Sequence, residues 1–132
     1  MAKILLVEDN ELNRDMLSRR LRRNGFEVCV AIDGPEGVDM AISERPDVIL
    51  MDVALGAMDG WEATQQIRTR LGSAAAPVIA LTAHALATDR LKSLAVGCAD
   101  FDTKPVDLER LLGKIRSCMA KARRSPIQAL SA

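Results

Sequence analysis

The sequence predicts an α/β fold: a doubly wound parallel sheet of five strands in the order 2-1-3-4-5, with five helices on its two faces. Short runs of Val, Ile and Leu alternate with segments of helical spacing along the 132 residues, as expected for successive βα units. Aromatic residues make up only 2% of the chain, so the core must be aliphatic, which suits parallel strands covered on both faces. Because the connections leave no room for long loops, right-handed crossovers place the helices on both sides of the sheet.

Five apolar runs have the length and composition of buried strands. We expect strands at residues 4–7, 28–32, 48–51, 78–81 and 99–103, the last less hydrophobic than the others. A chain of this length fits one domain with a proper core, and a second domain of any size is not expected.

Five segments of helical spacing follow these strands. They are marked by Leu12, Met16, Leu17 and Leu21; by Val38, Ala41 and Ile42; by Ala63, Ile67 and Leu71; by Ala87, Leu91, Leu94 and Ala95; and by Leu108, Leu111, Leu112, Ile115 and Met119. Pro35 suits the opening turn of the second helix, and Asp59 is placed to cap the third. Asn24-Gly25 and Gly97 are expected to end the first and fourth helices.

The composition limits the classes of partner. With 18 basic and 18 acidic residues the formal net charge is zero, which predicts no general attraction to nucleic acid or to anionic membranes. No apolar run approaches the ~20 residues of a membrane span, and no signal-peptide pattern follows Met1, so we expect a cytoplasmic protein. Cys29, Cys98 and Cys118 are widely spaced without a CxxC pattern, which favours reduced thiols over a disulfide or a zinc site.

The end of the chain is predicted to differ from the rest. Residues 1–121 are expected to form the domain, and residues 122–132, beginning with a linker-like basic and Pro-containing stretch at 123–126, are expected to form a flexible C-terminal tail. No effector domain fits after residue 120, so we expect the protein to act by binding other proteins.

Polar residues stand where four of the predicted strands end. Strand 1 finishes in Glu8-Asp9, strand 3 in Asp52, strand 4 in Thr82 and strand 5 in Lys104. In the order 2-1-3-4-5 these strands are neighbours, and ligands of open parallel sheets bind at the carboxyl ends of strands. We therefore expect three carboxylates, one hydroxyl and one amine to converge, whereas Asp33, after the edge strand, is interpreted as a turn or cap residue.

The chemistry of this set indicates a metal and phosphate site. Three crowded carboxylates raise one another's pKa unless a cation is present. They are too few for a calcium cage, but Mg²⁺ is commonly held by one or two carboxylates and keeps positions open for a phosphate oxygen. Lys104 and Thr82 suit the oxygens of a phosphoryl group carried by Asp52.

The same residues resemble a known family. Glu8-Asp9, Asp52, Thr82-Ala83 and Lys104-Pro105 at matching strand ends are similar to the receiver domain of two-component response regulators, over residues 3 to about 120. Phe101 matches the switch aromatic of that family. The resemblance implies a flavodoxin-like fold, and a cis bond between Lys104 and Pro105.

The resemblance also implies a role for each site residue. Asp52 would accept the phosphoryl group, Lys104 and Thr82 would bind its oxygens, and Thr82 with Phe101 would form the switch. Mg²⁺ would be held by Glu8, Asp9, Asp52 and the backbone carbonyl of Ala54. Ala54 and His84, two residues beyond Asp52 and Thr82, would modulate loss of the phosphate, and Gly56 stands where the family usually has Pro.

The function predicted from the resemblance is a single-domain response regulator. It would take a phosphoryl group from a histidine kinase or a histidine phosphotransfer protein and signal through a downstream protein target or a phosphorelay, as a monomer or weak dimer. It would catalyse only its own phosphorylation and dephosphorylation. The alternative is a phosphorylation-independent pseudo-receiver that acts as a protein-interaction module. A flavin-binding electron carrier is disfavoured, because the loop after strand 1 opens with two acids.

Overall fold

The structure, a computed structural model, describes residues 1–83 and 87–131, with residues 123–131 described by their backbone alone. Its centre is a parallel sheet of five strands in the order β2-β1-β3-β4-β5, as predicted. The strands are β1 (Lys3–Val7), β2 (Glu27–Ala31), β3 (Val48–Asp52), β4 (Val78–Thr82) and β5 (Asp100–Thr103). β1 and β3 are paired from Ile4 and Val48 onward, so their carboxyl ends lie side by side.

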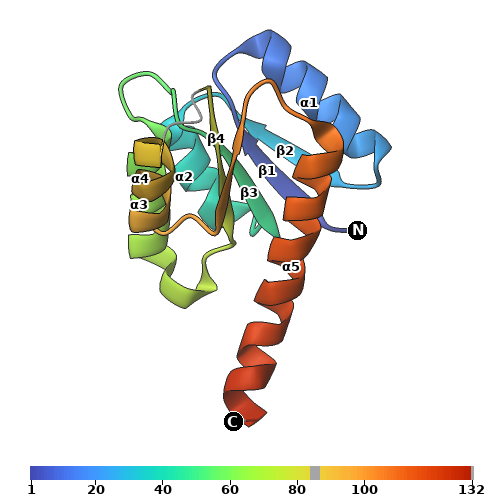
Figure 1. The fold of residues 1–132 in the computed structure, drawn as a ribbon, viewed down its shortest axis with the longest axis vertical. Helices are drawn as coiled ribbons and strands as arrows, with labels where there is room; N and C mark the ends of the chain where they lie inside the picture. The colour runs from blue at the N-terminus through green and yellow to red at the C-terminus, as the bar shows by residue number, and fades with distance from the viewer. Residues whose placement is uncertain (84–86, 132) are drawn as a thin grey trace.

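The helices cover both faces of the sheet. They are α1 (Glu11–Arg23), α2 (Gly34–Ser43), α3 (Gly60–Leu71), α4 (Ala87–Ala95) and α5 (Leu108–Ser131), with a short 3₁₀ helix, η1 (Gly72–Ala74), after α3. Figure 1 shows α1 and α5 on one side of the sheet and α2, α3 and α4 on the other. Two aliphatic clusters follow from this arrangement. Leu6, Leu50 and Ile115 belong to the one beneath α1 and α5, and Leu5, Ile49 and Ile67 to the one beneath α2 and α3.

Local signals in the sequence explain where several helices begin and end. The Asp33 side chain accepts a hydrogen bond from Glu36 N–H and caps α2, and Asp59 caps α3 by accepting from Glu62 N–H. Both predictions of a cap are therefore confirmed. After α4 the chain turns at Gly97, whose φ of +97° lies in the left-handed region that glycine adopts without strain.

Two helices expose apolar residues that marked them in the sequence. On α1, Leu17 and Leu21 are buried, but Leu12 is 79% exposed and Met16 is 49% exposed. On α4, Leu91 and Leu94 are also exposed, and the buried side chain is that of Ser93. The apolar spacing therefore located these helices correctly without identifying the face that meets the sheet.

The C-terminal helix is longer than expected. The sequence predicted that residues 122–132 form a tail, but the backbone continues as α5 to Ser131 and, in Figure 1, extends well beyond the sheet. The Ala, Arg, Gln and Leu residues in this stretch favour helix, whereas Pro126 opposes it. The division into a domain of residues 1–121 and a separate tail stays a prediction.

Within the part of the chain that the structure describes, no helix is both long and apolar enough to cross a membrane.

Candidate functional site

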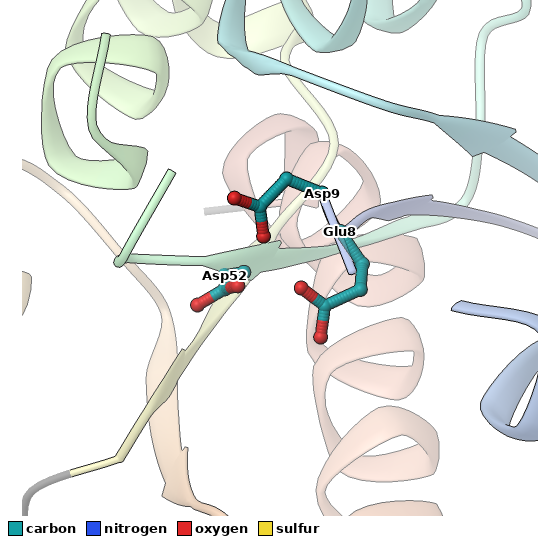
Figure 2. A group of neighbouring side chains, drawn as sticks. All are labelled: Glu8, Asp9 and Asp52. Atoms are coloured by element: carbon teal, nitrogen blue, oxygen red, sulfur yellow. The ribbon is translucent and has the colours of Figure 1, made fainter. Parts of the chain in front are cut away.

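The carboxyl ends of the strands bring the predicted site residues together. Glu8 and Asp9 follow β1, Asp52 ends β3 and Lys104 follows β5. Figure 2 shows the carboxylate groups of Glu8, Asp9 and Asp52 close together where β1 and β3 end. One carboxylate oxygen from each lies within 4.8 Å of the other two. Reading the strand ends as one edge therefore predicted the cluster correctly.

Lys104 places a cation against this cluster. Its Nζ lies 2.8 Å from Glu8 Oε1 and 3.1 Å from Asp52 Oδ2. Glu8 and Asp52 are almost completely buried, with exposed fractions of 4% and 3%, whereas Asp9 is exposed. The ammonium group therefore bridges two carboxylates that water reaches poorly, which is where a charge interaction is strongest.

Burial and mutual contact shift the pKa values of the bridged groups. Burial and, after it, the hydrogen bond with Asp52 raise the pKa of Glu8 from 4.5 to about 7, although Lys104 acts to lower it. Burial alone would raise the pKa of Asp52, but hydrogen bonds with Glu8 and with the Ala54 N–H, and the charge of Lys104, hold it below 3.8. Burial would lower the pKa of Lys104, but the Glu8 hydrogen bond and the charge of Asp52 raise it above 10.5.

These shifts make the stability of the metal-free protein depend on pH. Glu8 keeps its proton up to about pH 7 in the folded state but loses it near 4.5 when unfolded. Its stabilising effect is thus complete below pH 4.5 and is lost as the pH rises through 7. Relative to a Glu8→Gln variant, we expect the free energy of unfolding of the wild type to fall by about 2–4 kcal/mol between pH 4.5 and 8.

Denaturant unfolding in the presence of a chelator at a series of pH values measures this difference. If the difference in free energy of unfolding between wild type and Glu8→Gln stays constant from pH 4.5 to 8, then Glu8 titrates normally in the folded protein.

The loop after β3 fixes one oxygen of Asp52. Asp52 Oδ1 accepts a hydrogen bond of 3.0 Å from Ala54 N–H, so Oδ1 is held by the loop while Oδ2 faces Lys104. A Cβ at Gly60 would overlap the backbone carbonyl oxygen of Asp52, and this requires a glycine where α3 begins against the end of β3. A Cβ at Gly56 would meet no atom within 4 Å, so a larger residue would have room at this position.

Thr82 and Phe101 lie where the resemblance placed the switch. Thr82 is 1% exposed at the end of β4, and its hydroxyl donates to Asp89 Oδ2 of α4 over 3.4 Å. Phe101 is half-buried on β5, with Arg90 and Lys114 each within 6 Å of its ring centre, at 5.7 and 5.4 Å. The roles of these residues, and of Ala54 in modulating the site, stay predictions, and His84 falls outside the described residues.

The Lys104–Pro105 peptide bond is cis, as the resemblance implied.

Asp102 is a site that the sequence did not reveal. It is a 3% exposed carboxylate on β5 whose Oδ1 accepts hydrogen bonds from both Nε and Nη2 of Arg110, each at 2.8 Å. The only available signal was an acid in an otherwise apolar strand position with a basic residue eight positions later.

A groove opens beside the cluster on the α1 side. It has a volume of about 490 Å³ and is lined by Glu8, Asn13, Met16, Leu17, Arg20, Leu81, Lys104, Pro105 and Val106. Its walls are mostly apolar, and its lining includes Glu8 and Lys104, which form the ion pair at the site. The exposed Met16 therefore belongs to the rim of the site.

The donor atoms of the cluster fit a hard divalent cation. The ligand set consists of carboxylate oxygens from Glu8, Asp9 and Asp52, and these are the hard donors that a divalent cation such as Mg²⁺ takes. The described residues are thus able to hold a metal ion, and Asp52 presents a charged oxygen beside it.

The fold and this site define a class of protein. A family model described as "Response regulator receiver domain" matches residues 4–116. The chain belongs to this family of two-component signalling proteins.

Among curated proteins, Protein PilH of Pseudomonas aeruginosa is 38% identical over 120 residues, covering 91% of this chain and 99% of PilH. Several longer response regulators also match, and the chain spans about half of their length, 52%.

Solved structures of similar fold include one receiver domain with a bound metal ion and one in complex with a phosphotransfer protein. The receiver domain of a sensor histidine kinase from Pseudomonas aeruginosa PAO1, solved with a magnesium ion in its active-site cleft, is 37% identical with a TM-score of 0.80, over 90% of this chain and 98% of that one. A receiver domain of Saccharomyces cerevisiae Ssk1, solved with the histidine phosphotransfer protein Ypd1, is 32% identical with a TM-score of 0.85, over 91% and 90% of the two chains.

Proposed function

We propose that this chain accepts a phosphoryl group on Asp52 from a histidine kinase or a histidine phosphotransfer protein. The observation that carries the proposal is the contact between Asp52 Oδ2 and Lys104 Nζ, 3.1 Å apart, inside a cluster of three carboxylates. A buried carboxylate kept ionised beside a fixed cation is a suitable nucleophile. The presence of all five site residues supports acceptance over the alternative of a pseudo-receiver.

Glu8, Asp9, Asp52 and the backbone carbonyl of Ala54 would hold Mg²⁺. When bound, Mg²⁺ supplies charge neutralisation to the oxygens of the transferring group. Because Glu8 binds a proton up to about pH 7, binding of the metal and loss of that proton are linked.

The transfer step uses groups that the chain itself provides. A carboxylate oxygen of Asp52 forms a bond to phosphorus as the bond from phosphorus to the histidine nitrogen of the donor breaks, and that nitrogen keeps the electron pair. Lys104 Nζ neutralises charge on the equatorial oxygens, and the Thr82 hydroxyl donates to one of them. The product is an acyl phosphate, which water later hydrolyses, so the chain catalyses only its own phosphorylation and dephosphorylation.

The new charge would then alter the output surface. A phosphoryl group adds ~1.5 to 2 negative charges, which draw the Thr82 hydroxyl toward the site and let Phe101 follow. Ala54 offers no side-chain partner to an attacking water, which favours a long-lived phosphate. The changed surface of α4, β5 and α5 would bind a protein target or pass the phosphate on.

Uptake of a phosphoryl group tests the proposal directly. The chain is incubated with a phosphohistidine form of a phosphotransfer protein, with Mg²⁺ or with a chelator, and its intact mass is followed over time. We expect a gain of one phosphoryl group that needs the metal. No gain from any phosphohistidine or small acyl phosphate donor would leave the pseudo-receiver as the better account.

The groove lined by Met16 and Arg20 is the surface that we propose for the donor. Met16→Glu places a charge on an apolar rim that a docking helix would cover, and we expect it to slow transfer from a protein donor by about 10-fold. Transfer from acetyl phosphate, which needs no docking surface, is expected to stay unchanged.

Ile42→Glu is the matched control, since Ile42 is a partly exposed apolar residue of α2. Equal slowing by both variants, or slowing with acetyl phosphate as well, would argue against docking in the groove.

A further inference from the structure

Helix α4 contacts the site through one acidic side chain. Asp89, in its first turn, accepts the hydrogen bond from the Thr82 hydroxyl through Oδ2, at 3.4 Å. Near its other end, Ser93 accepts a hydrogen bond of 2.9 Å from the indole N–H of Trp61 on α3. Ser93 is also the buried residue of this helix, whose Leu91 and Leu94 are exposed. These contacts give α4 a specific side-chain link to Thr82 and another to α3.

The hydroxyl of Thr82 is the donor for which Asp89 and a phosphoryl group on Asp52 would compete. A hydroxyl carries one proton and donates one strong hydrogen bond at a time. Because Thr82 is 1% exposed, water competes little with Asp89 for this hydrogen bond. If this hydroxyl is to donate to a phosphoryl oxygen on Asp52, it must leave the carboxylate of Asp89.

We propose that Asp89 is a positioning residue that competes with the phosphoryl group for the Thr82 hydroxyl. In the unphosphorylated chain, the carboxylate of Asp89 holds the hydroxyl toward α4. After transfer the proton stays on Thr82 Oγ1, and the hydrogen bond changes acceptor from Asp89 Oδ2 to a phosphoryl oxygen. Release of Asp89 frees the first turn of α4, which links the state of Asp52 to a helix that exposes two leucines.

The length of the bond suits an exchange of this kind. At 3.4 Å it is longer than the 2.5–3.0 Å typical of hydroxyl donors, so its loss costs less than that of an optimal bond to a charged acceptor. The bond is thus able to favour the position of the Thr82 hydroxyl toward Asp89 without preventing its move to a phosphoryl oxygen. This inference rests on the function proposed above, because the competing acceptor is the phosphoryl group on Asp52.

A second role for Asp89 has to be separated from this one. An acid in the first turn of a helix also stabilises the helix through its dipole. That effect acts on the helix whatever residue occupies position 82, whereas competition for the hydroxyl requires Thr82. A double-mutant cycle with Thr82→Val, which keeps the shape of the side chain and removes the hydroxyl, distinguishes the two.

The experiment measures affinity for beryllofluoride, an analogue of the phosphoryl group, in Mg²⁺. Trp61, the single tryptophan, contacts Ser93 and has Lys92 Nζ 4.3 Å above its ring, so its fluorescence reports on α4. Removal of the acceptor in Asp89→Ala is expected to tighten binding about 3- to 10-fold, and Asp89→Asn, which keeps a neutral acceptor, to have a smaller effect. In the Thr82→Val background Asp89→Ala is expected to change affinity by less than about 2-fold.

Asp39→Ala is the control for loss of an acidic side chain, because Asp39 is exposed on α2. If Asp89→Ala tightens beryllofluoride binding equally with Thr82 and with Thr82→Val, or does not tighten it with Thr82, the inference is overturned. The proposed function is not affected by either result. A wild-type chain that binds no beryllofluoride overturns the proposed function and this inference with it.

Discussion

Asp52→Asn is expected to abolish phosphoryl uptake while leaving the chain folded. The amide that replaces the carboxylate has no charged oxygen to attack phosphorus, and loss of a nucleophile reduces turnover by roughly 1000-fold or more. The side chain keeps its size, and an amide oxygen is still able to accept from Ala54 N–H, which holds Oδ1 in the wild type. Contact with Asp52 raises the pKa of Glu8, so the same substitution is expected to lower it.

Asp39→Asn makes the same chemical change on the exposed face of α2 and serves as the control. Intact-mass measurement after incubation with a phosphohistidine donor gives the extent of uptake, and thermal unfolding shows whether each variant is folded. Uptake at a normal rate by folded Asp52→Asn would place the acceptor on another residue.

The sequence was sufficient for the site because the fold itself brings strand ends together. Once five apolar runs had been assigned to a parallel sheet in the order 2-1-3-4-5, the residues after strands 1, 3 and 5 had to share one edge. Glu8, Asp52 and Lys104 are separated by as many as 96 positions, yet no knowledge of side-chain packing was needed to place them together.

Helix faces were harder to predict, because apolar spacing does not say which apolar residues meet the sheet. Met16 belongs to the same helical stripe as Leu17 and Leu21, but it lines the groove beside the site instead of the core. On α4 the buried position is Ser93, whose polarity is satisfied by the indole of Trp61. A buried hydrogen bond of this kind depends on two helices that are distant in sequence, and neither residue alone indicates it.

Buried ion pairs escaped prediction for a related reason. Asp102 would be costly on a strand that faces the core, and the two contacts of its Oδ1 with Arg110, together with Lys114 Nζ at 3.8 Å, both from α5, offset that cost. The position of Asp102 in the sheet follows from its strand alone. Its partner lies on α5, and the sequence does not show which face of that helix meets the sheet.

Lys104→Met is expected to have the second largest effect, and to act on both chemistry and stability. Removal of the cation that contacts both Glu8 and Asp52 eliminates a fixed donor to the transferring oxygens, which reduces the rate of phosphoryl uptake by about 100-fold or more. It also leaves Asp52 and ionised Glu8 without their partner. Because Lys104 lowers the pKa of Glu8, that pKa is expected to rise above its wild-type value of about 7.

The loss of stability should therefore depend on pH in a defined direction. At pH 5 Glu8 already carries a proton in the wild type, so the variant loses only the contact with Asp52. At pH 8 the variant loses the contacts with Asp52 and with ionised Glu8, and we expect the destabilisation to grow to about 1–3 kcal/mol. This is less than for a completely buried ion pair, because Lys104 is 22% exposed. Denaturant unfolding at the two pH values in a chelator measures the difference.

Lys121→Met, an exposed lysine of α5, controls for the general loss of a positive charge. Mg²⁺ gives a further test, since a cation that binds the folded cluster restores stability by mass action. If Lys104→Met were equally destabilising at pH 5 and pH 8, and Mg²⁺ did not reduce the loss, then Lys104 would be holding β5 in place and not neutralising the acids around Asp52.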